Sequence, residues 1–296
     1  METLTFLGRE IPVYGLMGVS GMCLAMAYAL FSCRKFGLDR DDTAYIFVLG
    51  ALGSAAGAKV LYLIVSADEI AVDIMSDEMS MLMIVNRHIS GGMVFYGGLL
   101  GALAAAWYTA RRYGKDAADF FPVLIPGFAL AHGIARIGCL LTGCCYGIEA
   151  DLPISITYHS SYTAPNGVPL LPVQAMEAAA EILIFIVLII VSNHMRNPAE
   201  GSSSAENSKI EKNSRTAENC GTVTDRITVL WIYFFMYAPL RFCLEFLRGD
   251  EARGSFLMFS TSQWLSIVLA AAAAVQLYIH RHRGIRKCRD KETAGR

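Results

Sequence analysis

Residues 131–147 read AHGIARIGCLLTGCCYG, an apolar segment with Arg136 and His132 in its interior. A charged side chain inside a bilayer costs on the order of a few kcal/mol unless it faces a cavity or a partner. Helical spacing predicts that one face of this segment carries the polar and small residues His132, Arg136, Cys139 and Gly143. We therefore expect a functional site on that face.

A second segment repeats this pattern. Residues 237–249 read YAPLRFCLEFLRG and place Arg241, Glu245 and Arg248 at helical spacing among apolar residues. Two arginines at separate places in one apolar chain indicate a shared polar environment rather than two isolated charges.

The composition is typical of a membrane protein. The chain has 296 residues, of which 54% are hydrophobic and only 17% charged, whereas soluble proteins carry about 25% charge. The apolar residues form long runs, which predict an all-α, polytopic helical bundle. We expect seven transmembrane helices, at 11–33, 43–66, 91–110, 118–141, 173–193, 227–247 and 262–280. A net charge of −1 gives no reason to expect a nucleic-acid partner.

The basic residues predict an orientation. Of the 25 Lys and Arg residues, 18 lie in loops on one side of these spans, 4 lie on the other side, and 3 lie inside spans. Positive charge favours the cytoplasmic side, so we expect the N-terminus outside and the C-terminus in the cytoplasm.

The remaining segments complete a single integral membrane domain over 1–296. Residues 67–90 and 142–172 are predicted to be outer loops that form small cap segments, and the apolar MSMLMIV in the first could be an interfacial helix. Residues 197–226 have almost no large apolar side chains and are expected to be a disordered cytoplasmic loop. Residues 281–296 are expected to be a basic cytoplasmic tail.

With this topology, polar residues from six spans fall in the outer half of the membrane. They are Tyr14, Lys59, Tyr96, Arg136, Gln174, Glu177, Glu181, Arg241 and Glu245. One polar cavity explains this placement, and its arginines suit bidentate recognition of a phosphate, as in an anionic phospholipid headgroup. The alternative is that Arg241 and Glu245 form a structural i,i+4 pair that pins two helices.

Residues 91–101, GGMVFYGGLLG, place Tyr96 among dense glycines. Such glycines allow a close approach by a ligand or by another helix. We predict substrate-binding roles for Gly91, Gly92, Gly97 and Gly98, with helix packing as the alternative. For Tyr96 the alternative is an interfacial aromatic residue.

Three of the eight cysteines, Cys139, Cys144 and Cys145, lie within seven residues and follow His132. Thiols and an imidazole could form a soft metal site or a thiol relay. The alternative is that these cysteines are small packing residues at a tight helix end.

In this order along the chain, several segments resemble those of the prolipoprotein diacylglyceryl transferase family. The resembling segments are PVYGLMG (12–18), GGMVFYGGLLG (91–101), ARIGCLLTGCCYG (135–147), LLPVQAME (170–177), YAPLRFCLEFLRGDEA (237–252) and SQWLSI (262–267). The resemblance places the family's functional tyrosine on Tyr14, its essential arginine on Arg136, and its sixth-span arginine and glutamate on Arg241 and Glu245.

The resemblance implies an enzyme of the bacterial plasma membrane with its site towards the outer leaflet. The family transfers a diacylglyceryl group from phosphatidylglycerol to the lipobox cysteine in the signal peptide of a prolipoprotein, and needs neither cofactor nor metal. Arg136 and Arg241 would stabilise the phosphate, Glu245 would orient Arg241, and Tyr96 or His132 would help to activate the thiol. Substrate-binding roles would extend to Tyr14, Gly138, Gly143 and Arg248.

The sequence also departs from the family pattern. A family histidine is replaced by Tyr96, a signature asparagine by Cys139, a glutamate by Cys144, and a glycine by Ala135. These departures leave two alternatives open: a divergent member with another acceptor, and a non-catalytic protein that binds phospholipid, thiols or metal.

Overall fold

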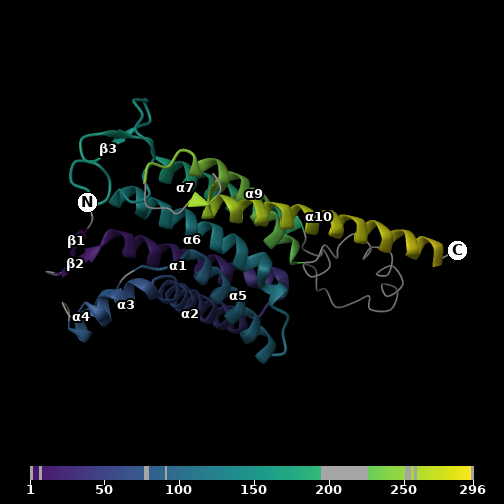
Figure 1. Cartoon of the computed structure of the whole chain (residues 1–296). Helices are drawn as coiled ribbons and strands as arrows, with labels where there is room; N and C mark the ends of the chain where they lie inside the picture. The colour runs from purple at the N-terminus through teal and green to yellow at the C-terminus, as the bar shows by residue number, and fades with distance from the viewer. Residues whose placement is uncertain are drawn as a thin grey trace. The chain divides into compact units, whose positions relative to one another are not determined.

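The computed structural model describes residues 3–6, 9–76, 80–90, 92–194, 226–250, 255–256 and 259–294. Side chains are described over the same residues except 3–6, 9–11, 90, 95–96, 255–256 and 283–294. The described chain is predominantly α-helical (Figure 1). By its internal packing the chain divides into two compact units, one of residues 1–37 and 121–296 and one of residues 38–120.

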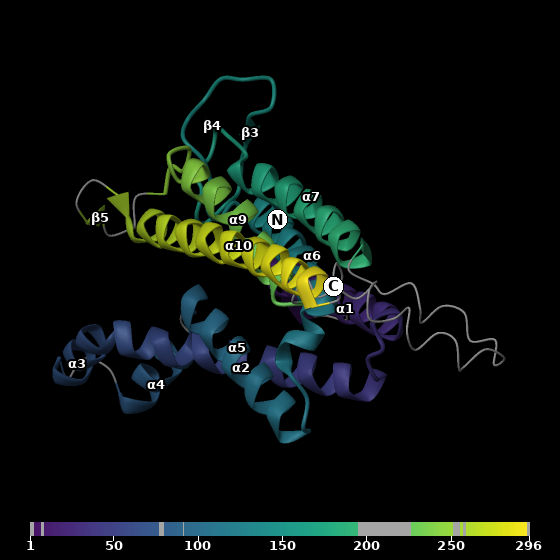
Figure 2. The ribbon, with the colours of Figure 1, turned by 90° about the vertical axis from the view of Figure 1, so that its right-hand side faces the viewer.

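The larger unit is a bundle of long helices. Its helices are α1 (Val13–Ser32), the 3₁₀ turn η1 (Cys33–Phe36), α6 (Phe121–Thr142), α7 (Val173–His194), α9 (Thr228–Glu245) and α10 (Thr261–Ala294). Helix α6 packs between α1 and α7, and α9 packs between α7 and α10 (Figure 2). The bundle core is therefore built by α6, α7 and α9.

Short strands precede α1 and lie in the segments between α6 and α7 and between α9 and α10. They form three hairpin-like pairs: β1 (Thr3–Phe6) with β2 (Arg9–Pro12), β3 (Ile156–Thr157) with β4 (Pro169–Leu170), and β5 (Ser255–Phe256) with β6 (Phe259–Ser260). The segment predicted as an outer cap, residues 142–172, thus contains the β3–β4 pair and is ordered.

The smaller unit consists of α2 (Arg40–Val65), α3 (Ala67–Met75), α4 (Met81–Ser90), α5 (Phe95–Arg112) and the 3₁₀ turn η2 (Ala117–Phe120). The loop predicted at 67–90 is therefore largely helical, and α4 is the helix expected from its apolar residues. Helices α2 and α5 pack at backbone contact, because a Cβ on Gly57 would lie 2.2 Å from the carbonyl oxygen of Gly97. Glycine is the residue that permits such an approach.

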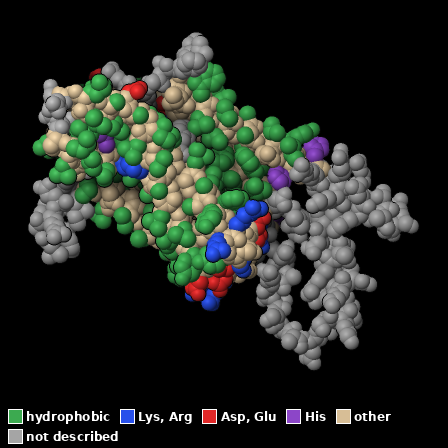
Figure 3. Space-filling model, turned by 60° about the horizontal axis from the view of Figure 1, so that its bottom comes forward, with side chains coloured by type: hydrophobic (Ala, Val, Ile, Leu, Met, Phe, Trp, Pro, Cys, Tyr) green, Lys and Arg blue, Asp and Glu red, His purple; other side chains and the backbone are tan. Residues whose placement is uncertain are grey.

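Five helical segments among the described residues are long and apolar enough to cross a membrane. They are Val13–Phe36, Arg40–Val65, Ala117–Thr142, Val173–His194 and Thr261–His282. Large apolar side chains on these segments face outward: Phe31 is 75% exposed and Ile190 is 63% exposed. Apolar side chains also cover much of the described surface in Figure 3. The chain is a polytopic helical membrane protein.

Helix α6 ends at Thr142 and α9 ends at Glu245, within two residues of the ends predicted for these spans. The predicted helical faces are wrong at one position each, because Gly143 and Arg248 lie beyond these helices. Helix α10 continues to Ala294, through most of the predicted basic tail. The predicted disordered loop at 197–226 lies outside the described residues except for Arg226.

Candidate functional site

Two carboxylates on α7 organise the polar core of the larger unit. Glu177 and Glu181 are 1% and 0% exposed and lie one helical turn apart. A buried carboxylate needs hydrogen bonds and an opposite charge. Each of these two obtains partners from both neighbouring helices.

Glu177 binds Arg136 and Tyr237. The Nε atom of Arg136 on α6 lies 3.1 Å from Oε2 of Glu177. The hydroxyl of Tyr237 on α9 donates to Oε1 of the same carboxylate at 2.9 Å. Glu177 thus joins three helices and fixes the position of the Arg136 guanidinium.

Glu181 has a parallel arrangement one turn further along α7. His132 Nδ1 lies 2.7 Å from Oε1 of Glu181, and the Tyr233 hydroxyl donates to that oxygen at 3.0 Å. The His132 ring also packs edge-on against Tyr237, with centroids 5.3 Å apart. His132 therefore lies in the bundle core and is held by a carboxylate.

Arg241 is the second buried arginine of this core. Its Nη1 atom lies 2.6 Å from Oε2 of Glu245, one turn along α9, and its Nη2 donates to Ser262 Oγ of α10 at 3.5 Å. Arg241 also interacts electrostatically with Glu177 and Tyr237, as Arg136 does. Both arginines therefore interact with one carboxylate and one phenol, Glu177 and Tyr237.

The helix directions explain this meeting point. Arg136 lies near the C-terminal end of α6, Glu177 near the N-terminal end of α7, and Arg241 near the C-terminal end of α9. Consecutive spans run in opposite directions, so these ends lie at one end of the bundle.

At this end of the bundle, one buried side-chain oxygen of Gln174 and one of Glu181 have no hydrogen-bond partner among the described residues. Buried polar atoms in native proteins are usually hydrogen-bonded, so these unpaired oxygens indicate a site for a ligand or water.

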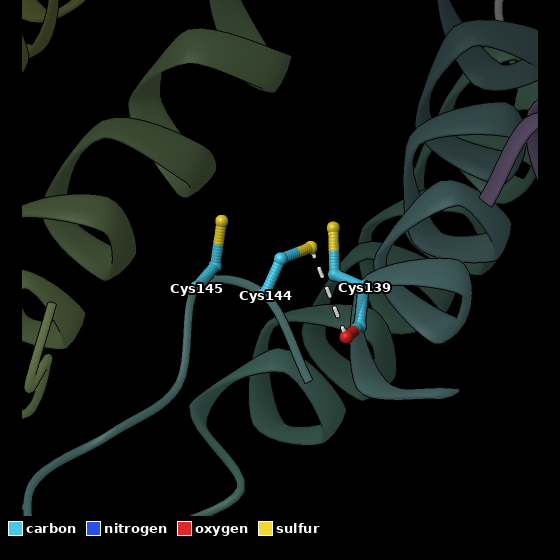
Figure 4. A group of neighbouring side chains, drawn as sticks. All are labelled: Cys139, Cys144 and Cys145. Carbon is cyan, nitrogen blue, oxygen red and sulfur yellow. Dashed lines mark hydrogen bonds between the residues drawn. The ribbon is translucent and has the colours of Figure 1, made fainter. Parts of the chain in front are cut away.

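The three cysteines lie beside Arg136 at this end of the bundle. Cys139 comes from α6, and Cys144 and Cys145 come from the loop that follows it (Figure 4). Their sulfur atoms all lie within 4.8 Å of one another. All three cysteines are free thiols. His132 does not belong to this cluster, so the predicted imidazole ligand is not supported.

Neighbouring groups act on the Cys145 thiol. The pKa of Cys145 is lowered by hydrogen bonds from the Cys139 and Cys144 thiols, and further by the positive charges of Arg248 and Arg136, against the opposing effect of burial. The neighbouring thiols and the two guanidinium groups therefore favour the thiolate form of Cys145.

Arg248 borders the same cluster. It pairs with Asp250 through two contacts of 2.9 Å and also interacts electrostatically with Cys145. The side-chain amide of Gln174 donates to the Cys144 carbonyl oxygen at 2.7 Å. These contacts connect the cysteine loop to the end of α9 and the start of α7.

The predicted tyrosine on α1 also reaches this region. Tyr14 interacts electrostatically with Arg136 and with all three cysteine thiols. The two glycines predicted beside it have packing roles: a Cβ on Gly138 would lie 2.9 Å from Met17 Cβ, and Gly143 has a left-handed φ of 77° against Ser161.

The remaining predicted residues belong to the smaller unit. Gly97 and Gly98 pack against Gly57 and Ser54 of α2, so their position is explained by helix packing. Gly92 lies against the Tyr62 ring. Gly91 and the Tyr96 side chain lie outside the described part of the structure.

Lys59, which we expected in the shared cavity, binds inside the smaller unit. Its Nζ donates to the carbonyl oxygens of His88 and Gly92 at 3.2 and 3.1 Å. His88 is itself buried and lies 2.9 Å from Asp73. This hydrogen-bond contact links α3 to α4, a role that the sequence did not reveal.

Sequence reasoning also missed Tyr233, Tyr237 and Asp250. The two tyrosines lie one turn apart in an apolar helix, where a phenol is hard to distinguish from a packing aromatic. Tyr233 and Tyr237 are four residues apart, as are Glu177 and Glu181, and this equal spacing could have indicated that the two tyrosines pair with the two carboxylates.

Comparison with known proteins identifies the family of this chain. The family model described as prolipoprotein diacylglyceryl transferase matches residues 2–206 and 213–279. A Clostridium tetani protein named phosphatidylglycerol–prolipoprotein diacylglyceryl transferase is 29% identical over 260 residues, covering 88% of this chain and 89% of its own length. A Clostridium perfringens protein named phosphatidylglycerol–prolipoprotein diacylglyceryl transferase 2 is 27% identical over 284 residues, covering 96% of each chain.

A further relative, from Geobacter sulfurreducens and named phosphatidylglycerol–prolipoprotein diacylglyceryl transferase, is 25% identical over 261 residues, covering 87% of this chain and 86% of its own. The match to the family model extends across both compact units and includes every segment that contributes to the polar core. The chain belongs to the prolipoprotein diacylglyceryl transferase family.

Proposed function

We propose that this protein transfers a diacylglyceryl group from phosphatidylglycerol to the lipobox cysteine thiol of a prolipoprotein. The family and the names of its relatives support this reaction and these substrates. The structural observation that carries the proposal is the convergence of Arg136 and Arg241 on Glu177 and Tyr237 inside a membrane-spanning bundle.

In the proposed mechanism the two arginines bind the phosphodiester of phosphatidylglycerol. A guanidinium offers paired donors that match phosphate oxygens, and its charge is strengthened where water is excluded. Glu177 orients Arg136, and Glu245 orients Arg241. The phosphate acquires negative charge as the glyceryl carbon–oxygen bond breaks, and both arginines are placed to stabilise it.

The acceptor thiol supplies the nucleophile. Its sulfur forms the thioether bond to the glyceryl carbon, and glycerol phosphate leaves with the electron pair of the broken bond. Tyr14 and Arg248 border the same end of the bundle, and we assign them to substrate binding. His132 is held by Glu181 and acts in positioning the core.

We further propose seven spans, with α5 and α9 crossing the membrane beside the five segments of sufficient length and apolarity. The excess of basic residues then favours an external N-terminus, a cytoplasmic C-terminus and a site towards the outer leaflet. Alkaline phosphatase, which folds only outside the cytoplasm, tests this arrangement when it is fused after residue 76 or after residue 296. Activity is expected only from the first fusion, and the reverse result rejects the topology.

The reaction itself is tested with the purified full chain, labelled phosphatidylglycerol and a lipobox peptide. Thioether product is expected from the wild-type protein. Arg136→Lys should abolish turnover, because an ammonium group cannot reproduce the bidentate contact. Arg34→Lys is the matched control, since Arg34 is exposed in the same unit. Absence of product from wild-type protein, beside an active relative, would reject the transferase assignment.

A non-catalytic lipid-binding role is the second candidate. The observation that favours it is the presence of Tyr96 at the position of a family histidine. In that case phosphatidylglycerol would bind the protein and be recovered intact after incubation with the peptide.

A further inference from the structure

The cluster of Cys139, Cys144 and Cys145 has no role in the mechanism proposed above. Three sulfur atoms lie within 4.8 Å of one another, although a disulfide uses only two. Figure 4 shows the sulfurs gathered between the end of α6 and the following loop. Tetrahedral Zn²⁺ with bonds of about 2.3 Å holds sulfurs about 3.8 Å apart, so small side-chain rotations would close the site around one ion.

The loop conformation supports a site rather than simple packing. Cys145 has a φ of 58°, the left-handed region that non-glycine residues seldom occupy. A packing residue has no need of such a backbone, and strain of this kind is concentrated at functional sites. The loop is also fixed from outside, because Gln174 donates to the Cys144 carbonyl oxygen at 2.7 Å and Ser161 donates to the Thr142 carbonyl oxygen at 3.0 Å.

The cluster also differs in exposure from a purely structural metal site. Cys139 is buried, whereas Cys144 and Cys145 are partly exposed. Structural zinc sites use four protein ligands, whereas catalytic sites use three and leave the fourth position for water or substrate. The described residues supply three sulfur ligands and no fourth.

We propose that Cys139, Cys144 and Cys145 bind one Zn²⁺ ion, and that the fourth position of this ion takes the thiol of the acceptor cysteine. The second part of this proposal rests on the proposed transferase function. It also differs from the expectation of a metal-free reaction that the family resemblance implied.

A zinc-bound thiolate explains how the acceptor thiol could be activated although Tyr96 replaces the family histidine. On binding Zn²⁺ the acceptor S–H bond breaks, the proton passes to water, and the sulfur is held as a thiolate. That sulfur then forms the bond to the glyceryl carbon while the carbon–oxygen bond to phosphate breaks, and the electron pair of that bond remains on glycerol phosphate. No oxidant or reductant is needed. Tyr96 then need not act as the base.

The surrounding charge suits this site. Zn²⁺ with three thiolates carries a net charge of −1, and a fourth thiolate makes it −2. Arg136 and Arg248 both border the cluster and offset part of that charge, although each is also paired with a carboxylate, Glu177 and Asp250. Arg136 would also bring the phosphate of the lipid next to the acceptor sulfur.

Direct binding is tested with the full-length protein in detergent, stripped of metal and titrated with Co²⁺ as a coloured substitute for Zn²⁺. One equivalent should give sulfur-to-cobalt charge-transfer absorption, and Zn²⁺ should abolish it. Cys145→Ser and Cys139→Ala should each lose the absorption, while Cys23→Ser, in α1, should retain it. A wild-type protein without this absorption, or with a Cys139–Cys144 disulfide after full reduction and metal addition, overturns the proposal.

The fourth position is tested by adding a lipobox peptide to the cobalt-loaded protein. A cysteine peptide should shift and strengthen the charge-transfer absorption, and the same peptide with serine should not. Thioether formation should fall when the metal is removed and return with Zn²⁺ but not with Mg²⁺. Equal rates for metal-free and zinc-loaded protein would overturn the zinc role and leave the transferase function intact. Cobalt binding without any thioether product would instead reject the transferase function.

Discussion

The ion pair between Arg136 and Glu177 gives the sharpest test of the polar core. Glu177 is 1% exposed and holds Arg136 at 3.1 Å and the Tyr237 hydroxyl at 2.9 Å. Glu177→Gln keeps the size and shape of the side chain but removes its charge. The Arg136 guanidinium then remains buried without its closest carboxylate.

Removing one partner of a buried ion pair typically costs about 3–5 kcal/mol. For a chain of this size, each kcal/mol lowers the unfolding temperature by roughly 2–4 °C. We therefore expect Glu177→Gln to unfold roughly 10 °C below the wild-type protein. Thermal unfolding in one detergent, followed by circular dichroism, measures this difference. Glu149→Gln is the matched control, because Glu149 is exposed, and exposed substitutions usually change stability by less than about 0.5 kcal/mol.

A double-mutant cycle separates the interaction energy of the Arg136–Glu177 pair from the other effects of each substitution on stability. The variant that carries both Arg136→Gln and Glu177→Gln should be more stable than the sum of the single effects predicts, by about 0.5–3 kcal/mol. Strict additivity of the two effects would refute the reasoning, since it would mean that the two side chains do not stabilise each other.

Two further predictions concern helix packing and thiol reactivity. Gly97→Ala should destabilise the protein by about 1–3 kcal/mol, because the added Cβ would lie 2.3 Å from the Gly57 carbonyl oxygen. Gly18→Ala is the control and should not lower the unfolding temperature, because a Cβ on Gly18 would have no atom within 4 Å. Equal effects of the two changes on the unfolding temperature would contradict the packing argument. In metal-free protein, the reaction of Cys145 with iodoacetamide should persist to lower pH than that of an ordinary thiol, whose pKa is about 8.5, because the pKa of Cys145 is lowered. Peptide mass spectrometry at several pH values measures this, and a rate that falls with pH as for an ordinary thiol would count against the lowered pKa.

The helices and the buried arginines could be predicted from the sequence. Long apolar runs determine where a chain crosses a membrane, and a charge such as Arg136 inside one of them is too costly to lack a partner. The meeting of Arg136 with Arg241 followed from the alternating direction of the spans. It required no knowledge of side-chain contacts.

The pairing within the core could not be predicted. Glu177 and Glu181 both face the neighbouring helices, and only the rotation and depth of α6 decide that Arg136 binds the first and His132 the second. Tyr237 could not be told apart from an aromatic residue that only packs, because nothing in an apolar sequence shows whether a tyrosine hydroxyl donates a hydrogen bond. The helical face predicted through Gly143 was also wrong, because α6 ends at Thr142 and Gly143 has a left-handed φ of 77°.

The carboxylates that hold the arginines have a consequence for how a lipid would enter. In the resting structure Arg136 and Arg241 are already neutralised by Glu177 and Glu245. An arriving phosphodiester would therefore share each guanidinium with an internal carboxylate instead of filling an empty positive pocket. This sharing lowers the affinity for any loosely fitting anion, because a single guanidinium that already holds an acid offers a second anion little net charge, whereas an anion that contacts both guanidinium groups gains from each.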